Sequence, residues 1–171
     1  MSLKYFLNLL LFSGFLSIFN SCQPTNEKST SLILIRHAEK MIASSNDPQL
    51  STKGWQRANE LVHIFEAVDI DAVYASPYRR TIDTARPLAT AKQLEILQYD
   101  PNKLVSFAQE ILKTHQGETV VIIGHSNTTP QLTNALAGTE YSDLEETEYD
   151  WLYFVEMSPE GTPNVKKLQI Q

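Results

Sequence analysis

The chain has 171 residues, of which 42% are hydrophobic, and this length and composition suit a single globular domain with a buried core. The formal net charge of −6 disfavours nucleic acid and anionic membrane surfaces as partners. The single cysteine, Cys22, excludes an internal disulfide and any zinc site built from cysteines.

An apolar run near the start of the chain predicts export. Tyr5 to Phe19 is apolar apart from an asparagine, a few serines and a glycine, and it follows a single basic residue, Lys4. The run is shorter than the roughly 20 residues of a membrane-spanning helix. We therefore predict that residues 1–21 are a signal peptide.

The end of this run carries the cysteine. Asn20-Ser21-Cys22 resembles the lipobox of bacterial lipoproteins, whose cysteine is lipidated and becomes the mature amino terminus, although Phe19 stands where that motif usually has leucine. An ordinary cleaved signal peptide and an uncleaved anchor are the alternatives. We expect residues 22–30 to be a flexible tether and residues 31–171 to be the domain. The lipid anchor alone would attach this domain to the membrane, on its periplasmic or cell-surface side.

Strand-like and helix-like segments alternate beyond the tether. Short apolar runs predict buried strands, and the segments between them repeat their apolar residues at helical spacing. The predicted strands are 32–35, 71–75, 94–97, 119–123 and 151–157, followed by an edge strand at 164–170. The predicted helices start after Ser51, at Arg80, at Pro101 and at Asn127.

This alternation predicts the fold class. Strands that alternate with helices form a mostly parallel sheet with both faces covered, so we expect a three-layer α/β/α domain of about five or six strands with an antiparallel edge. Pro87 predicts a kink or a second helix start. The acidic run 140–150 contains no basic residue and is typical of a solvated loop or a short helix.

Polar motifs stand where three of the predicted strands end. They are Arg36-His37-Ala38-Glu39, Ser76-Pro77-Tyr78-Arg79-Arg80-Thr81-Ile82-Asp83-Thr84-Ala85 and Gly124-His125. Ligands of open α/β sheets bind at the carboxyl ends of the strands, so we expect these motifs to meet there. A guanidinium group suits bidentate contact with phosphate oxygens, and a neutral imidazole is a good nucleophile toward phosphorus.

Together the motifs closely resemble the histidine phosphatase superfamily, also called the phosphoglycerate mutase-like family. The marks of that family are an Arg-His-Gly or Arg-His-Ala box, a Ser-Pro-x-x-Arg-x-x-x-Thr-Ala box and a Gly-His box, present here in that order. The segment from Gln49 to Ala58 also looks like the family's Leu-Thr-x-x-Gly-x-x-x-Ala stretch. The resemblance spans Leu32 to about Val155, and it is to the short branch without the family's inserted segment, as in phosphohistidine phosphatases.

The resemblance implies a chemistry that needs no metal and no cofactor. His37 would attack phosphorus and form a phosphohistidine that water hydrolyses. Arg36 and Arg79 would hold the phosphoryl oxygens, with Arg80 as a helper or salt-bridge partner, and protonated His125 would be a further donor. We expect smaller phosphate-binding contributions from Ser126, Asn127 and Asn46.

The resemblance does not identify the acid that protonates the leaving group. Larger members carry a glutamate on the inserted segment, and Glu39 and Asp100 are the nearest candidates by position in this chain. We predict a phosphatase that acts on a phosphorylated small molecule or a phosphoprotein. The alternative is a non-catalytic lipoprotein that binds anions or a protein partner. Phosphoglycerate mutase activity fits less well, because mutases enclose the reactant beneath the missing segment.

Overall fold

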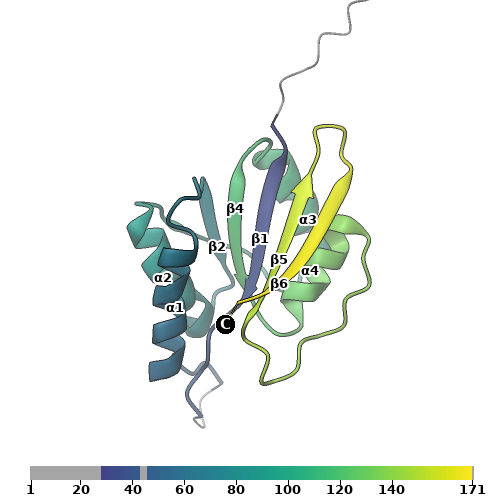
Figure 1. Ribbon diagram of the computed structural model, residues 1–171. Coiled ribbons are helices and arrows are strands. Elements are labelled where there is room, and N and C mark those ends of the chain that lie inside the picture. The colour runs from purple at the N-terminus through teal and green to yellow at the C-terminus, as the bar shows by residue number, and fades with distance from the viewer. Residues whose placement is uncertain (1–27, 43–45, 171) are drawn as a thin grey trace, which may run out of the picture.

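The computed structural model describes residues 28–42 and 46–170. The predicted signal peptide, Cys22 and the first part of the predicted tether lie outside the described residues. The strands are β1 Thr30–Arg36, β2 Ala72–Ala75, β3 Ile96–Gln98, β4 Thr119–Gly124, β5 Trp151–Met157 and β6 Pro163–Gln169. The helices are α1 Thr52–Ile64, α2 Arg79–Ala91, α3 Leu104–Thr114 and α4 Thr128–Ala137 (Figure 1).

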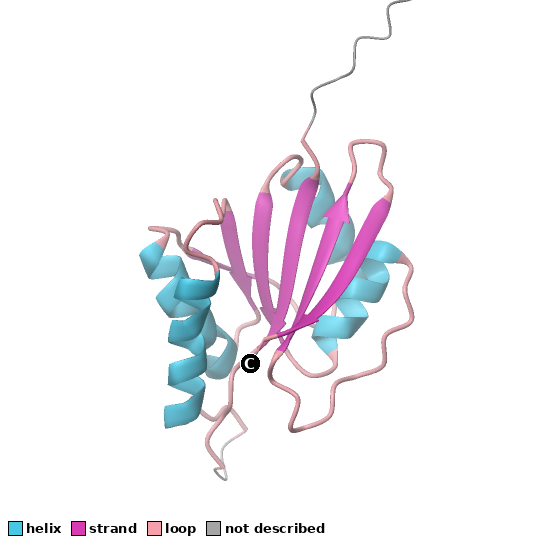
Figure 2. Ribbon diagram, viewed as in Figure 1, coloured by secondary structure: helices cyan, strands magenta, loops and turns pink. Residues whose placement is uncertain are grey.

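The strands form one six-stranded sheet in the order β3-β2-β4-β1-β5-β6. The first four in this order run parallel, β5 is antiparallel to β1, and β6 is antiparallel to β5. Helices lie on both sides of the sheet (Figure 2). The predicted three-layer α/β/α domain with an antiparallel edge is therefore confirmed.

Two hydrophobic cores lie on opposite faces of the sheet. On one face Leu32 and Leu34 of β1 pack with residues of α3 and α4, and on the other Ile33 and Ile35 pack with residues of α1 and α2. These four side chains are at most 2% exposed. The uninterrupted apolar run of β1 is thus explained by burial on both faces, which is typical of a central strand in a parallel sheet.

Two details differ from the sequence-based expectation. The third strand begins at Ile96 rather than at position 94, because Gln93 has a φ of 57° and the backbone N–H of Leu94 still bonds to the carbonyl oxygen of Ala89 at the end of α2. Helix α2 continues through Pro87 without a new start. The buried Leu88 and Ala89 on this helix pack against the sheet and offset the backbone hydrogen bond that proline cannot make.

Within the described residues, no helix is long and apolar enough to cross a membrane.

Candidate active site

Strands β1 and β4 end side by side and bring the two motif histidines together. The register pairs Arg36 with Gly124, and the backbone N–H of His37 donates to the carbonyl oxygen of Gly124 at 2.9 Å. The ring centroids of His37 and His125 lie 5.5 Å apart. A Cβ atom on Gly124 would lie 2.8 Å from the hydroxyl of Thr129, so any larger residue would push α4 away from this rim.

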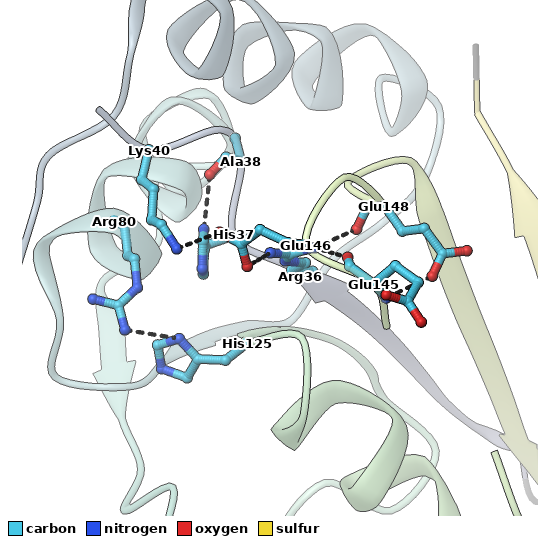
Figure 3. A network of polar contacts seen from close by, with 9 residues as sticks. All are labelled: Arg36, His37, Ala38, Lys40, Arg80, His125, Glu145, Glu146 and Glu148. Carbon is cyan, nitrogen blue, oxygen red and sulfur yellow. Dashed lines mark hydrogen bonds and ion pairs between the residues drawn. The ribbon is translucent and has the colours of Figure 1, made fainter. Parts of the chain in front are cut away.

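A cavity of about 310 Å³ opens at this rim. The residues that line it come from the ends of β1, β2 and β4, from the segment before α3, and from the loop between α4 and β5. They are Arg36, His37, Lys40, Tyr78, Arg80, Pro101, Asn102, His125, Ser126, Asn127, Thr128 and Glu146. Figure 3 shows the charged residues and imidazoles of this cavity.

His37 is held in the form that a nucleophile needs. Its Nδ1 lies 2.7 Å from the carbonyl oxygen of Ala38, which can only accept a hydrogen bond, so the proton is on Nδ1 and the lone pair is on Nε2. Burial lowers the pKa of His37 to about 3, with further lowering by the positive charges of Arg36 and Arg80 and the facing His125, although the bond to Ala38 raises it. The ring is therefore neutral at physiological pH.

Arg36 is fully buried and is fixed by the acidic loop (Figure 3). Its Nη1 donates to the carbonyl oxygens of Glu145 at 2.7 Å and Glu148 at 2.8 Å, and its Nη2 donates to the Glu146 carboxylate at 3.2 Å. The guanidinium also stacks on the Tyr149 ring at 4.0 Å. Both Nη1 protons are thus used by the loop, whereas the buried Nε has no hydrogen-bond partner among the described residues. On the edge formed by Nε and Nη2, Nε and the second proton of Nη2 therefore remain to meet a ligand.

Arg80, and not Arg79, lines the cavity, which corrects the sequence-based choice of Arg79 as a phosphate clamp. Arg79 is exposed and its Nη2 donates to the side-chain oxygen of Gln49 at 3.1 Å. Arg80 stacks on the Tyr78 ring at 4.6 Å and its Nη2 donates to Nδ1 of His125 at 3.3 Å. One residue is a rotation of about 100° on a helix, so the first residue of α2 faces solvent and the second faces the site.

A chain of hydroxyl groups fixes the tautomer of His125. The Thr81 hydroxyl donates to the carbonyl oxygens of Ser76 and Tyr78, so the Ser76 hydroxyl donates to Thr81 and accepts from Nε2–H of His125 at 2.8 Å. The lone pair on Nδ1 then accepts from Arg80. Burial, followed by the charge of Arg80, lowers the pKa of His125 to about 4, so this imidazole is also neutral at physiological pH.

Thr84 joins the two arginine-bearing segments, and sequence reasoning missed this role. Its hydroxyl accepts from the backbone N–H of Ala38 at 2.9 Å and donates to the carbonyl oxygen of Arg80 at 2.7 Å. Ala38 in turn supplies the carbonyl oxygen that holds the His37 ring. The spacing of Thr84 from Arg80, one helical turn, is the signal that could have placed both on the same face of α2.

The expected phosphate-binding helpers divide into two groups. Ser126 and Asn127 line the cavity, and Asn127 immediately precedes α4, whose first backbone N–H groups face this end of the sheet. Asn46 lies outside the cavity and lines a neighbouring one of about 360 Å³.

Neither expected acid lines the cavity. Glu39 accepts two hydrogen bonds from Arg57, at 2.9 and 3.0 Å, and lies 3.2 Å from Lys53. Burial alone would raise the pKa of Glu39, but the bonds from Arg57, its own backbone and Lys53 lower it to about 2. Asp100 is exposed and caps the backbone N–H of Asn102 at 2.9 Å, and this bond lowers its pKa. Both carboxyl groups thus have structural partners and are ionised at neutral pH, so the structure does not support either as the proton donor.

Glu146 is the carboxylate that the structure places in the cavity wall among the described residues, and sequence reasoning missed it. The loop that carries it was expected to be solvated, yet it wraps around Arg36. Glu146 also accepts from Nζ of Lys40 at 2.6 Å. Nothing local in an acidic run signals this contact, because Lys40 and Glu146 are 106 positions apart.

Comparison with known proteins gives a consistent picture. Residues 32–102 match the model of the histidine phosphatase superfamily (branch 1). Phosphoserine phosphatase 1 of Hydrogenobacter thermophilus is 25% identical in an alignment 164 residues long, and the match covers 65% of this chain and 78% of that protein.

Solved structures share the fold. The protein histidine phosphatase SixA complexed with tungstate is 16% identical with a TM-score of 0.66, over 81% of this chain and 96% of that one. YhfR of Bacillus stearothermophilus is 22% identical with a TM-score of 0.67, over 80% of this chain and 95% of that one. The family match over residues 32–102, the relative and the shared fold agree with the three motifs at the strand ends, and together they show that this chain is similar to the histidine phosphatase superfamily.

Proposed function

We propose that this protein is a phosphatase that hydrolyses phosphate monoesters, free or on a protein, through a phosphohistidine formed on His37. The observation that carries the proposal is that two buried guanidinium donors, Nε of Arg36 and Nη1 of Arg80, have no hydrogen-bond partner among the described residues, and that both arginines line the same cavity as His37. Arg80 Nη1 lies 3.5 Å from the Asp47 carboxylate, without the geometry of a hydrogen bond. Buried donors of this kind are costly unless a ligand satisfies them.

The reaction proceeds in two displacements. The lone pair of His37 Nε2 attacks phosphorus while the bond from phosphorus to the leaving oxygen breaks, and that oxygen takes up a proton. Water then attacks the phosphohistidine, the bond from phosphorus to nitrogen breaks, and inorganic phosphate leaves with His37 neutral again. Arg36 and Arg80 stabilise the negative charge on the three remaining phosphoryl oxygens in both steps.

His125 responds to the bound anion. Its pKa is low because the buried ring faces Arg80 and other cations. A phosphate dianion in the cavity reverses the sign of this field and raises the pKa, so the ring can take a proton on Nδ1 and donate it to a phosphoryl oxygen. Ser76 keeps Nε2 protonated throughout and therefore directs this change to Nδ1.

The charges of the cavity also support catalysis without a metal. Arg36, Lys40 and Arg80 are cationic, and Glu146 is the single carboxylate that the described residues contribute to the lining. Divalent cations bind best to several oxygen ligands of negative charge, and this wall instead supplies guanidinium groups in the place where a metal would neutralise phosphate.

The relatives suggest two substrate classes. One is named a phosphoserine phosphatase and another a protein histidine phosphatase. Cavities of about 360 and 480 Å³ share wall residues with the main one, so the leaving group can extend beyond a small alcohol. The lining carries no acid free of an ion pair among the described residues, which favours leaving groups that are weak bases, such as phenols or imidazoles.

We also propose that the protein is exported and anchored by a lipid on Cys22. The sequence of the leader supports this proposal. Localisation outside the cytoplasm would favour phosphate esters found there, rather than a cytosolic phosphorylated protein, as the substrate.

The test is hydrolysis of an aryl phosphate by the purified full chain in the presence of EDTA, beside its His37→Ala variant. We expect turnover by the wild type and at least a thousandfold loss in the variant. Equal rates in the two proteins would contradict the proposal. No turnover of aryl phosphates and phosphoramidates, with phosphate still bound, would favour the non-catalytic anion-binding alternative.

A further inference from the structure

The described residues that line the cavity carry a net positive charge. Among the described residues that line it, Arg36, Lys40 and Arg80 are cations and Glu146 is an anion, while burial keeps both imidazoles neutral. The surplus of two positive charges matches a phosphomonoester dianion. Asp47 contacts Arg80 but is not part of the lining.

Glu146 stands where a substrate would extend from the phosphate. Its Oε2 contacts Nη2 of Arg36, which belongs to the edge that meets phosphate, and its Oε1 contacts Nζ of Lys40. The same carboxylate and the same lysine line the adjacent cavity of about 360 Å³. The side chain is 67% exposed, so it is not buried against protein and can meet a ligand.

The charge of Glu146 is permanent at neutral pH. The hydrogen bond from Lys40 lowers the pKa of its carboxyl, and the charges of Lys40 and Arg36 lower it further, although partial burial opposes this. A carboxylate with two oxygens has lone pairs left after these two contacts, so it can accept a further donor from a ligand.

We infer that Glu146 determines substrate selectivity: it favours phosphate esters whose leaving group carries an ammonium or no charge, and it disfavours esters whose leaving group is anionic. This inference rests on the proposed function of the cavity as a phosphate site. A leaving group with a carboxylate or a second phosphate adds a third negative charge, whereas the net charge of the lining residues balances only two. This third charge also faces the carboxylate of Glu146. An ammonium in the same place accepts Glu146 as its counterion.

The expected effect follows from Coulomb's law. Unit charges about 6 Å apart in a largely aqueous environment change an affinity by about three- to tenfold. A cationic leaving group gains this factor and an anionic one loses it, so removal of the Glu146 charge is expected to lower the ratio of their affinities by about tenfold or more. The effect is expected to shrink as salt is raised.

Three esters of matched length separate charge from size: O-phosphoethanolamine, propyl phosphate and phosphoglycolate, with cationic, neutral and anionic leaving groups. Their affinities are measured by titration calorimetry in low salt with the full chain carrying His37→Ala, which binds without turnover. The same titrations are made with Glu146→Gln and, as a matched control, Glu140→Gln in that background. The Glu140→Gln substitution removes the same charge from the same loop, and Glu140 does not line the cavity.

We expect the order cationic, neutral, anionic in the parent protein, a loss of this order in Glu146→Gln, and ratios within twofold of the parent in Glu140→Gln. A uniform change of all three affinities in Glu146→Gln would show that Glu146 merely positions Arg36 and would overturn the inference. Failure of all three esters to bind would overturn both proposals. Normal charge preference in binding, with no turnover of any phosphate ester or phosphoramidate by the wild type, would overturn the proposed function alone.

Discussion

Replacement of Arg80 by methionine tests the site more sharply than any other single change in α2. Methionine keeps most of the apolar stem of Arg80 and removes the guanidinium, which stacks on Tyr78. The change therefore deletes a buried phosphate donor and its bond to His125 while the packing of the helix is largely preserved.

The magnitude follows from the burial of the guanidinium, whose side chain is 16% exposed. Opposite unit charges about 4 Å apart interact by about 4 kcal/mol at an effective dielectric constant of about 20. The open side of the cavity weakens this interaction, so we expect a loss of about 10²- to 10³-fold in kcat/KM, similar to the loss of one oxyanion donor in other enzymes.

Arg79→Met is the matched control, because it removes the same group one residue earlier. Arg79 is exposed and its guanidinium donates to Gln49, so its charge is screened by water and salt. We expect a change in kcat/KM of less than about threefold. Initial rates with an aryl phosphate measure both variants, and thermal unfolding shows whether each remains folded. A larger loss from Arg79→Met than from Arg80→Met would refute the assignment of Arg80.

Three other predictions concern the nucleophile, its support and the leader. Between pH 6.5 and pH 4.5 the wild type is expected to lose roughly 2–3 kcal/mol more unfolding free energy than His37→Asn. The reason is that the folded state keeps His37 neutral down to about pH 3, whereas the unfolded chain takes up the proton near pH 6.5. Urea titrations at both pH values measure the difference, and equal losses in the two proteins would contradict the low pKa. Thr84→Val is expected to cost about 1–3 kcal/mol of stability, because it leaves the N–H of Ala38 without an acceptor. The same change is expected to lower kcat at least tenfold. A kcat within twofold of wild type would show that the His37 ring is positioned independently of Thr84. Cys22→Ala is expected to release the protein from membranes into the soluble fraction, whereas unchanged retention would indicate an uncleaved anchor.

The fold was predictable because its signals are local. The apolar run of β1 and the helical spacing in α1 reflect burial that each segment requires by itself, and the alternation of strands and helices then implies the sheet. The two histidines were placed at one rim for the same reason, since each follows a buried parallel strand.

The choice of Arg79 over Arg80 was an error of alignment, because the arginine of the Ser-Pro-x-x-Arg-x-x-x-Thr-Ala box is its fifth residue, which is Arg80 when the box begins at Ser76. Contacts between distant parts of the chain, in contrast, could not be predicted from local signals. Glu146 pairs with Lys40 across more than half of the chain. The sequence of an acidic loop does not show whether the loop lies in solvent or wraps around a buried arginine. The candidate acids Glu39 and Asp100 were chosen by position, and only the structure shows that Arg57 and Asn102 occupy them.

The most direct test of the mechanism is capture of the covalent intermediate. Wild-type protein is mixed with an aryl phosphate, quenched in alkali, where a phosphoryl–nitrogen bond survives, and digested for mass spectrometry. We predict a phosphoryl group on the peptide that contains His37, formed within one turnover, lost on mild acid treatment and absent from His37→Ala. Turnover without any phosphorylated peptide, or with the phosphoryl group on another residue, would contradict the assignment of His37 as the nucleophile.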